Sequence, residues 1–209
     1  LYGVLAIVII GILGIPASSF IAVLSAAGLT IGLAFQGSLS NFAGGVLILL
    51  FKPFKIGDFV KEDVHGNEGL VEGIDLFYTR MRTFDNKIVI IPNGSLANTS
   101  ITNYTANNKR RIEIKVGISY DSDMKRAKDI LMNVINSQDG ILKNEDNKVY
   151  VDALEESQIT IGTMAWVMTD DYWKIKWELT EKFKNALDDA GIEIPFNQLS
   201  VTINEKQRK

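Results

Sequence analysis

The chain opens with a long apolar stretch and continues as shorter segments in which apolar and polar residues alternate. From residue 1 to residue 51 no residue is charged, and all 22 lysines and arginines and all 25 aspartates and glutamates follow. An apolar stretch of this length is typical of a segment in contact with lipid. The pattern therefore predicts two environments, a membrane for the first quarter of the chain and water for the rest.

The apolar stretch divides at Gly14, Ile15 and Pro16, which predict a turn. Residues 1–14 are then the end of one transmembrane helix, and residues 18–52 form a second helix. Because the chain opens on an apolar residue without a basic segment, we expect further membrane helix before it. Positive charge follows residue 51 at once, and this favours a cytoplasmic location for the remainder of the chain.

The second helix is longer than a hydrocarbon core of about 30 Å requires, so it should bend. We expect the hinge at Gly37, because glycine weakens a helix and the serines beside it offer alternative hydrogen bonds. Gly45, which follows Gly44, is either a second hinge or a site of close packing. Gln36 and Asn41 are polar, and either could line a pore or bond to a neighbouring helix.

Helical spacing places Leu29 and Leu33 on one stripe of this second helix. Small residues flank the stripe on both sides: Ala22, Ser25, Ala26, Gly28, Thr30 and Gly32. Bulkier residues lie toward the opposite side, where lipid or outer helices would cover them: Phe20, Leu24, Ile31 and Phe35. Two flanks without bulk suit a closed ring of identical helices, with the leucines as a hydrophobic constriction on its axis.

Small residues at helical spacing also have a simpler explanation, because they are common wherever two membrane helices touch. A membrane-anchored oligomeric scaffold, whose cytoplasmic cage binds a partner, is therefore the alternative to an ion channel. An anchor has no need of leucines between two small-residue faces, so the stripe favours the channel. A carrier would need intramembrane charges or paired broken helices, which this stretch lacks.

The polar part predicts two domains and a tail. Residues 53–104 contain short strands at 59–60, 69–74, 79–84 and 87–91, with Asp85 and Asn86 in a hairpin turn. Residues 105–196 alternate strand, helix, two strands and helix at 112–118, 123–136, 149–154, 159–168 and 173–189, which suggests a ferredoxin-like α+β domain. Residues 197–209 hold a last strand at 199–203 and a tail.

Candidate chemistry is sparse, so we expect no enzyme activity, no catalytic residue, no cofactor and no metal. His65 is the single histidine and is expected in a solvated loop. Asp121 or Ser122 is expected to cap the helix that follows. The three tryptophans are expected in the core of the α+β domain. A net charge of −3 argues against nucleic acid as a partner.

Several motifs together resemble the small-conductance mechanosensitive channel family. They are 36–41 (QGSLSN), 51–58 (FKPFKIGD), 81–83 (MRT), 90–94 (IIPNG), 120–123 (YDSD) and 190–192 (AGI), and they cover nearly the whole chain in the family's order. Ser25 and Thr30 depart from the pattern, since better-known members carry Gly and Ala there. This difference bears on the ease of gating.

The resemblance implies a homoheptamer in the inner membrane, with three membrane helices per subunit and a cytoplasmic C-terminal part. It implies a kinked pore-lining helix, a small Sm-like β-barrel domain, the α+β domain, and a C-terminal strand that pairs into an oligomeric β-barrel. Leu29 and Leu33 would form the closed constriction and Gly37 the kink. The implied function is a channel that membrane tension opens on hypo-osmotic shock, with lipids, ions and small solutes as its partners.

Overall fold

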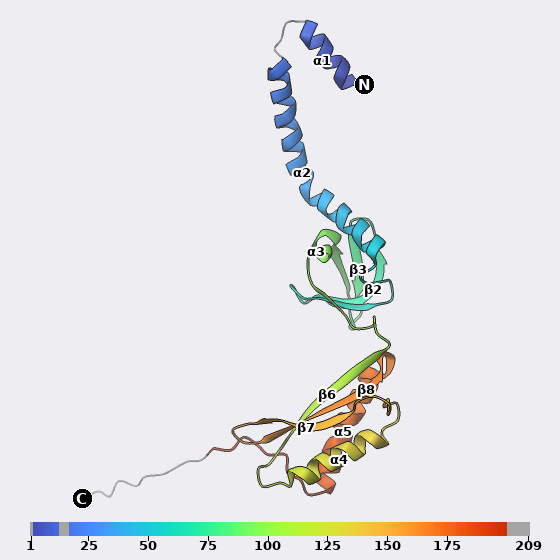
Figure 1. Ribbon diagram of the computed structural model, residues 1–209, viewed down its shortest axis with the longest axis vertical. Coiled ribbons are helices and arrows are strands. Elements are labelled where there is room, and N and C mark those ends of the chain that lie inside the picture. Colours follow the sequence, from blue (N-terminus) through green and yellow to red (C-terminus); the bar gives the residue numbers. More distant parts are fainter. Residues whose placement is uncertain (1, 13–16, 200–209) are drawn as a thin grey trace, which may run out of the picture. The chain divides into compact units, whose positions relative to one another are not determined.

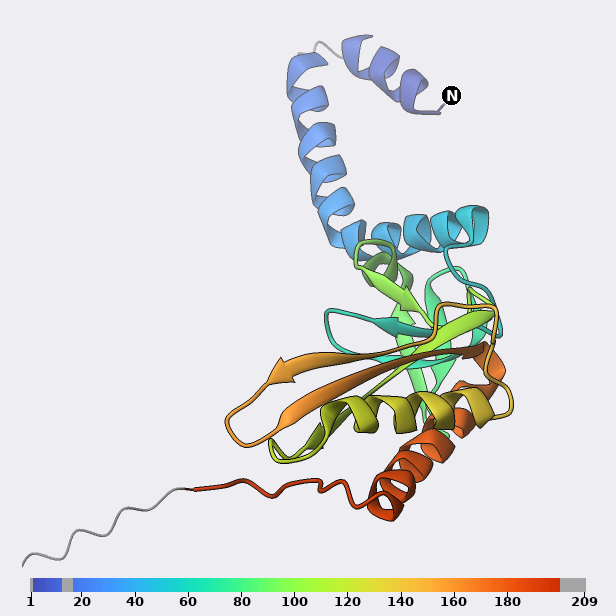
Figure 2. The same ribbon diagram turned by 60° about the horizontal axis from the view of Figure 1, so that its bottom comes forward.

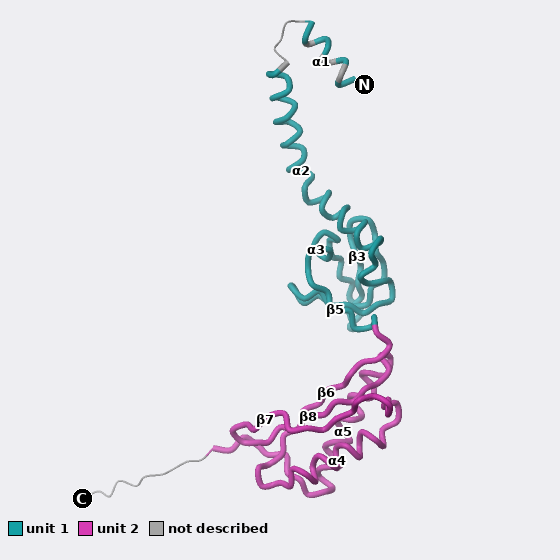
Figure 3. Tube along the Cα trace, viewed as in Figure 1, with its two compact units in different colours: residues 1–106 teal, residues 107–209 magenta. Residues whose placement is uncertain are grey.

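The computed structural model describes residues 2–12 and 17–199 and divides the chain into two compact units, residues 1–106 and 107–209 (Figure 3). The first unit contains the apolar helices and a β domain, and the second is an α+β domain (Figure 1). The expected turn at residues 14–16 lies outside the described residues. So does nearly all of the expected last strand at 199–203.

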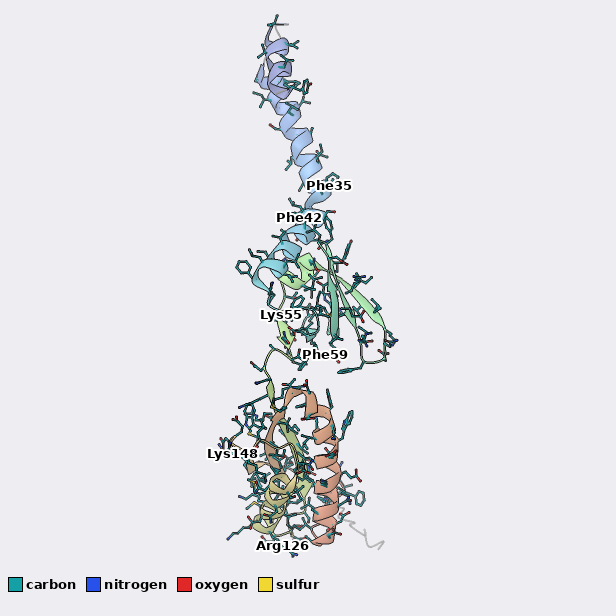
Figure 4. The ribbon with its side chains drawn as sticks, turned by 90° about the vertical axis from the view of Figure 1, so that its right-hand side faces the viewer. Phe35, Phe42, Lys55, Phe59, Arg126 and Lys148 are labelled. Carbon is teal, nitrogen blue, oxygen red and sulfur yellow. The ribbon has the colours of Figure 1, made fainter. Side chains whose placement is uncertain are left out.

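The apolar stretch forms two helices, α1 (Tyr2–Ile12) and α2 (Ala17–Phe51). In α2, residues 18–51 are long and apolar enough to cross a membrane, and the most apolar window of this segment is not buried. The helix bends sharply in its middle (Figure 2). Figure 4 labels Phe35 before this bend and Phe42 after it, so that Gly37 lies within the bent interval.

The β domain is a five-stranded antiparallel sheet with the strand order β4-β3-β2-β1-β5. Its elements are β1 (Phe59–Glu62), β2 (Glu68–Ile74), β3 (Tyr78–Arg82), β4 (Ile88–Pro92), the short helix α3 (Asn93–Ala97) and β5 (Ile101–Asn103). Four strands were expected close to these positions, whereas α3 and β5 were not. A β-bulge between Val71 and Gly73 shifts the register of β2 against β3.

The core of the β domain is completed by the membrane helix. Alternate residues of the strands, such as Val60, Val71 and Met81, point inward and are almost fully buried. Ile48 of α2 and Phe54, which follows α2, are buried in the same cluster. The end of α2 is therefore part of this core, and the sheet cannot bury its inner face without it.

The second unit packs two helices on a three-stranded antiparallel sheet with the order β6-β8-β7. Its elements are β6 (Lys109–Ile118), α4 (Met124–Ser137), β7 (Lys148–Leu154), β8 (Ile159–Met168), the 3₁₀ turn η1 (Thr169–Asp171) and α5 (Tyr172–Asp189). Both helices lie against the same face of the sheet (Figure 1). This is the predicted order of strands and helices.

Two local predictions about the second unit are wrong. The carboxylate of Asp123, not Asp121 or Ser122, caps α4 by accepting hydrogen bonds from the Lys125 and Arg126 amides. Trp173 and Trp177 are 42% and 66% exposed instead of packing in the core. The buried face of α5 is formed by Ile175, Leu179, Phe183 and Leu187, and the two tryptophans lie off it.

The loop between β1 and β2 is organised by a buried carboxylate. Glu62 is 1% exposed and accepts hydrogen bonds from the amides of Val64 and His65, and it lies 3.3 Å from the His65 ring. Burial by itself would raise the pKa of Glu62, but the hydrogen bonds from the His65 and Val64 amides outweigh it and hold the pKa below the ordinary 4.5. His65 is exposed in this loop, as expected.

Since the folded loop lowers the Glu62 pKa, Glu62 stabilises the loop at neutral pH, and this stabilisation is lost as the pH falls below about 4.5. We predict that Glu62→Gln weakens the loop by about 1 kcal/mol at pH 7, because a neutral acceptor replaces a charged one. Amide exchange of residues 62–67 should be several-fold faster at pH 7 and should approach the wild-type rate only when the pH falls below the lowered pKa of Glu62. The exposed Glu68→Gln is the matched control, and equal exchange in all three proteins would contradict the prediction.

Candidate functional site

The first half of α2 carries the predicted pore residues, and residues 21–35 are all exposed in the single chain. Leu29 and Leu33 are 64% and 61% exposed, one helical turn apart. The other predicted positions, Leu24, Ile31 and Phe35, are exposed as well, and Phe20 is half-buried. An apolar surface of this size is not stable in water, so lipid or further helices must cover it.

The small residues leave open space beside the leucine stripe. A Cβ atom added at Gly28 or Gly32 would meet no atom within 4 Å. The Thr30 hydroxyl donates a hydrogen bond of 2.8 Å to the Ala26 carbonyl, so its polar group is satisfied within the helix. Ala22 and Ser25 are also exposed. These flanks carry only small side chains, so another helix backbone can approach them closely.

The second half of α2 is held tightly against the β domain. A Cβ atom added at Gly44 would lie 2.5 Å from the Asn93 carbonyl oxygen, and one at Gly45 would lie 2.1 Å from the Leu76 carbonyl oxygen. Real Cβ atoms essentially never lie this close to a non-bonded atom, so both positions require glycine. Of the two explanations that the sequence left open for Gly45, close packing has this direct support. A hinge at Gly45 stays a prediction.

Hydrogen bonds reinforce the same junction. The Asn41 side-chain oxygen accepts a bond of 3.0 Å from the Gly94 amide at the start of α3. Asn93 is fully buried, accepts a bond of 2.7 Å from the Thr79 hydroxyl and donates one of 2.8 Å to the Asp75 carbonyl. Asn93 thereby fixes both the start of α3 and the loop before β3, against which Gly45 packs.

The sequence did not predict that Asn41, Gly44 and Gly45 of α2 meet Asn93 and Gly94 in a single contact. The run 92–94 (Pro-Asn-Gly) was recognised only as a motif. For Asn41 the sequence left two roles open, lining a pore or bonding to a neighbouring helix, and in the structure its side chain accepts a hydrogen bond from the Gly94 amide of α3. Two adjacent glycines directly before the bulky apolar run 46–51 were the available signal for the contact. No sequence rule indicates which distant backbone approaches them.

The remaining surface offers little for catalysis. Within residues 2–12 and 17–199, no group of three or more His, Asp or Glu side chains is arranged to hold a metal ion. The buried titratable group Glu62 is engaged by its own loop. The candidate functional site is therefore α2, with a free apolar first half and a second half fixed to the β domain.

The geometry defines a class of protein, a membrane-helix protein with a folded domain joined rigidly to the end of the helix. Comparison with known proteins makes the class specific. The model of the "Mechanosensitive ion channel, beta-domain" matches residues 37–106, and that of the "Mechanosensitive ion channel MscS, C-terminal" matches residues 112–194. The first match begins within the bent interval of α2 and runs to the end of the first unit.

Individual relatives agree with these matches. An uncharacterized MscS family protein of Buchnera aphidicola is 42% identical over 94% of this chain and 69% of that protein. A small-conductance mechanosensitive channel of Edwardsiella ictaluri is 42% identical over 84% of this chain and 61% of that protein. The crystal structure of Helicobacter pylori MscS in its closed state superposes with a TM-score of 0.88 at 34% identity, covering 96% of this chain and 79% of that one.

The chain belongs to the MscS family of mechanosensitive ion channels. The predicted family and fold class are thereby confirmed, and the protein is a membrane protein of a channel family, not of an enzyme family. The structural relatives support self-assembly. The pore constriction, the small-residue contacts and the hinge stay predictions.

The junction generates a prediction about stability. Gly45→Ala forces a Cβ atom onto the Leu76 carbonyl, so either α2 or the loop before β3 must move, at a cost of about 2 kcal/mol. We expect a lower midpoint of thermal unfolding for the purified full chain. Gly37→Ala is the control, because its Cβ atom meets nothing within 4 Å and should not lower the midpoint. Unchanged stability together with altered gating in Gly45→Ala would instead favour the hinge.

Proposed function

We propose that this protein is a channel that opens under membrane tension and releases ions and small solutes on hypo-osmotic shock. The observation that carries the proposal is the division of α2. Its first half presents Leu29 and Leu33 between two open, small-residue flanks, while Gly44 and Gly45 hold its second half on the β domain. One part of the helix is thus free to tilt, and the other is anchored.

In the proposed assembly, seven copies place their leucine stripes on a common axis. A ring of leucines is a hydrophobic constriction, which water leaves and ions cannot cross. Tension favours the state with the larger area in the membrane plane, so it favours tilted or separated helices and a wetted pore. Phe20, Leu24, Ile31 and Phe35 would face lipid or outer helices. The protein would be a multi-pass protein of the inner membrane, with its β and α+β domains in the cytoplasm.

Patch-clamp recording of the full-length protein in liposomes under increasing suction tests this proposal. Stepwise currents that appear with tension support it. A correctly assembled oligomer that stays silent up to the lytic tension would contradict it and would favour the alternative of a membrane-anchored scaffold.

Leu33→Ser tests the constriction. Each substituted side chain should lower the cost of wetting the pore by about 2 kcal/mol, so the channel should open at a lower tension. Ile31→Ser removes the same kind of side chain from the opposite side of α2 and should shift the threshold less. Equal thresholds in Leu33→Ser and wild type would exclude Leu33 as the gate.

Gly37→Ala tests the hinge. Alanine favours a straight helix by about 1 kcal/mol relative to glycine, and at this position it introduces no clash. We expect a changed rate of closure or inactivation at constant tension, measured from the decay of the macroscopic current. Gly11→Ala in α1 is the matched control, since its Cβ atom is equally unhindered. If both variants decay like wild type, Gly37 is not a hinge.

A further inference from the structure

The sequence contains a single asparagine that is followed directly by glycine, Asn93 before Gly94. This pair is prone to deamidation, a reaction in which the next backbone nitrogen attacks the asparagine side chain and ammonia is released. Glycine favours the attack because it has no side chain to hinder its own nitrogen. By its sequence, Asn93 is therefore the asparagine of this chain that is chemically least stable.

The structure places this asparagine where it is most protected. Among the described residues Asn93 is the one asparagine that is buried, with 0% of its surface exposed, and Gly94 is buried as well. Both belong to α3, which contacts the second half of α2 (Figure 1). Burial keeps water and hydroxide away from the pair. The helical backbone also lacks the conformation of the five-membered ring that deamidation must form.

Helix α2 holds the attacking nitrogen. The Gly94 nitrogen must lose its proton before it can attack, and its N–H donates a hydrogen bond of 3.0 Å to the Asn41 side-chain oxygen of α2. A neutral amide oxygen accepts this bond without removing the proton. Helix α3 has only five residues, too few to be stable alone, so its backbone also depends on the contact with α2.

The group that is attacked is held by the β domain itself. The Thr79 hydroxyl donates a hydrogen bond of 2.7 Å to the Asn93 side-chain oxygen, on which negative charge would form during the attack. A donor aimed at that atom stabilises the charge. The Asn93 side-chain nitrogen, which would leave, donates a bond of 2.8 Å to the Asp75 carbonyl. These two bonds do not involve α2, whereas the restraint on the Gly94 nitrogen does.

We propose that Asn93 is a deamidation site that its contact with α2 controls. The side chain is stable while Asn41 is bonded to Gly94, and it reacts when the second half of α2 leaves the β domain. The proposal does not depend on channel opening, because both partners of the contact belong to the first unit of one chain.

The reaction uses only water and hydroxide. In the separated state, hydroxide removes the Gly94 amide proton, and the nitrogen forms a bond to Cγ of Asn93. The bond from Cγ to the side-chain nitrogen breaks, and the leaving nitrogen takes a proton from water and departs as ammonia, which restores the hydroxide. Water then opens the ring at either carbonyl and leaves aspartate or isoaspartate at position 93.

Neither product can rebuild the contact. Aspartate has no donor for the Asp75 carbonyl and would place an unpaired charge in a buried position. Isoaspartate lengthens the backbone by one carbon at the start of α3. In both cases the surface that α2 meets is changed, so a transient separation of α2 from the β domain becomes permanent.

Peptide mapping of the purified full chain, incubated at mildly alkaline pH, tests the proposal. Trypsin should release the fragment 88–109, in which mass spectrometry locates deamidation at Asn93. Asn41→Leu removes the acceptor of the Gly94 amide. We expect about five-fold faster deamidation at Asn93, because loss of one hydrogen bond makes local opening more frequent by about this factor. Gln36→Leu makes the same exchange at an exposed position of α2 and should react like wild type.

Two further variants separate the chemistry from the packing. In Gly45→Ala the Cβ atom would lie 2.7 Å from the Asn93 side-chain nitrogen, so this variant disturbs the same contact elsewhere and should also speed the reaction. In Gly94→Ala the Cβ atom would lie 2.7 Å from the Asn41 side-chain oxygen. This change disturbs the contact too, but its methyl group hinders the nitrogen, so Gly94→Ala combined with Asn41→Leu should not exceed the wild-type rate.

Three results would overturn the proposal. Reaction of wild-type Asn93 as fast as in the isolated peptide 88–109 would show that the fold gives no protection. Equal, slow rates in wild type, Asn41→Leu and Gly45→Ala would show that the β domain protects Asn93 without α2. An equal acceleration at Asn136, which is exposed on α4, would show general unfolding. Because no current is recorded, a silent channel would not affect any of these outcomes.

Discussion

The contact between the second half of α2 and the β domain is the constraint on which the rest of the first unit depends. Gly44 and Gly45 allow the helix backbone to touch the Asn93 and Leu76 carbonyls, and one turn later Ile48 enters the domain core. Without this approach the sheet would lack part of its core, and the membrane helix would have no fixed end. Buried Asn93 shapes the surface that α2 meets, because its side chain bonds to Thr79 and Asp75 and so holds the start of α3 beside the loop before β3.

The attachment of the second half of α2 to the β domain determines what movement of its first half can do. A helix of 35 residues that was mobile throughout could not transmit a change in the membrane to a folded domain. In α2 the bend separates an uncovered apolar half from a half that moves with the sheet (Figure 2).

The sequence predicted most elements because their local signals agree with the final fold. Alternation of apolar residues located four strands of the β domain, and Gly191, with φ +69°, follows the end of α5 in the conformation that glycine favours. The local signals failed where the tertiary structure decides. Helix α3 and strand β5 are short and are held by contacts with α2 and β1. Trp173 and Trp177 were expected in the core, although α5 directs them outward.

By itself, the sequence determined that the chain has a membrane part and a water-exposed part, that the leucine stripe lies between small residues, and to which family the chain belongs. These properties depend on composition, helical periodicity and contiguous motifs, all of which are local. Only the tertiary structure decided that Gly44, Gly45 and Asn41 meet α3 and the loop before β3, and that Asn93 and Gly94 are buried at this contact. These residues are separated along the chain from the groups they contact, and close packing at a single backbone distance brings them together.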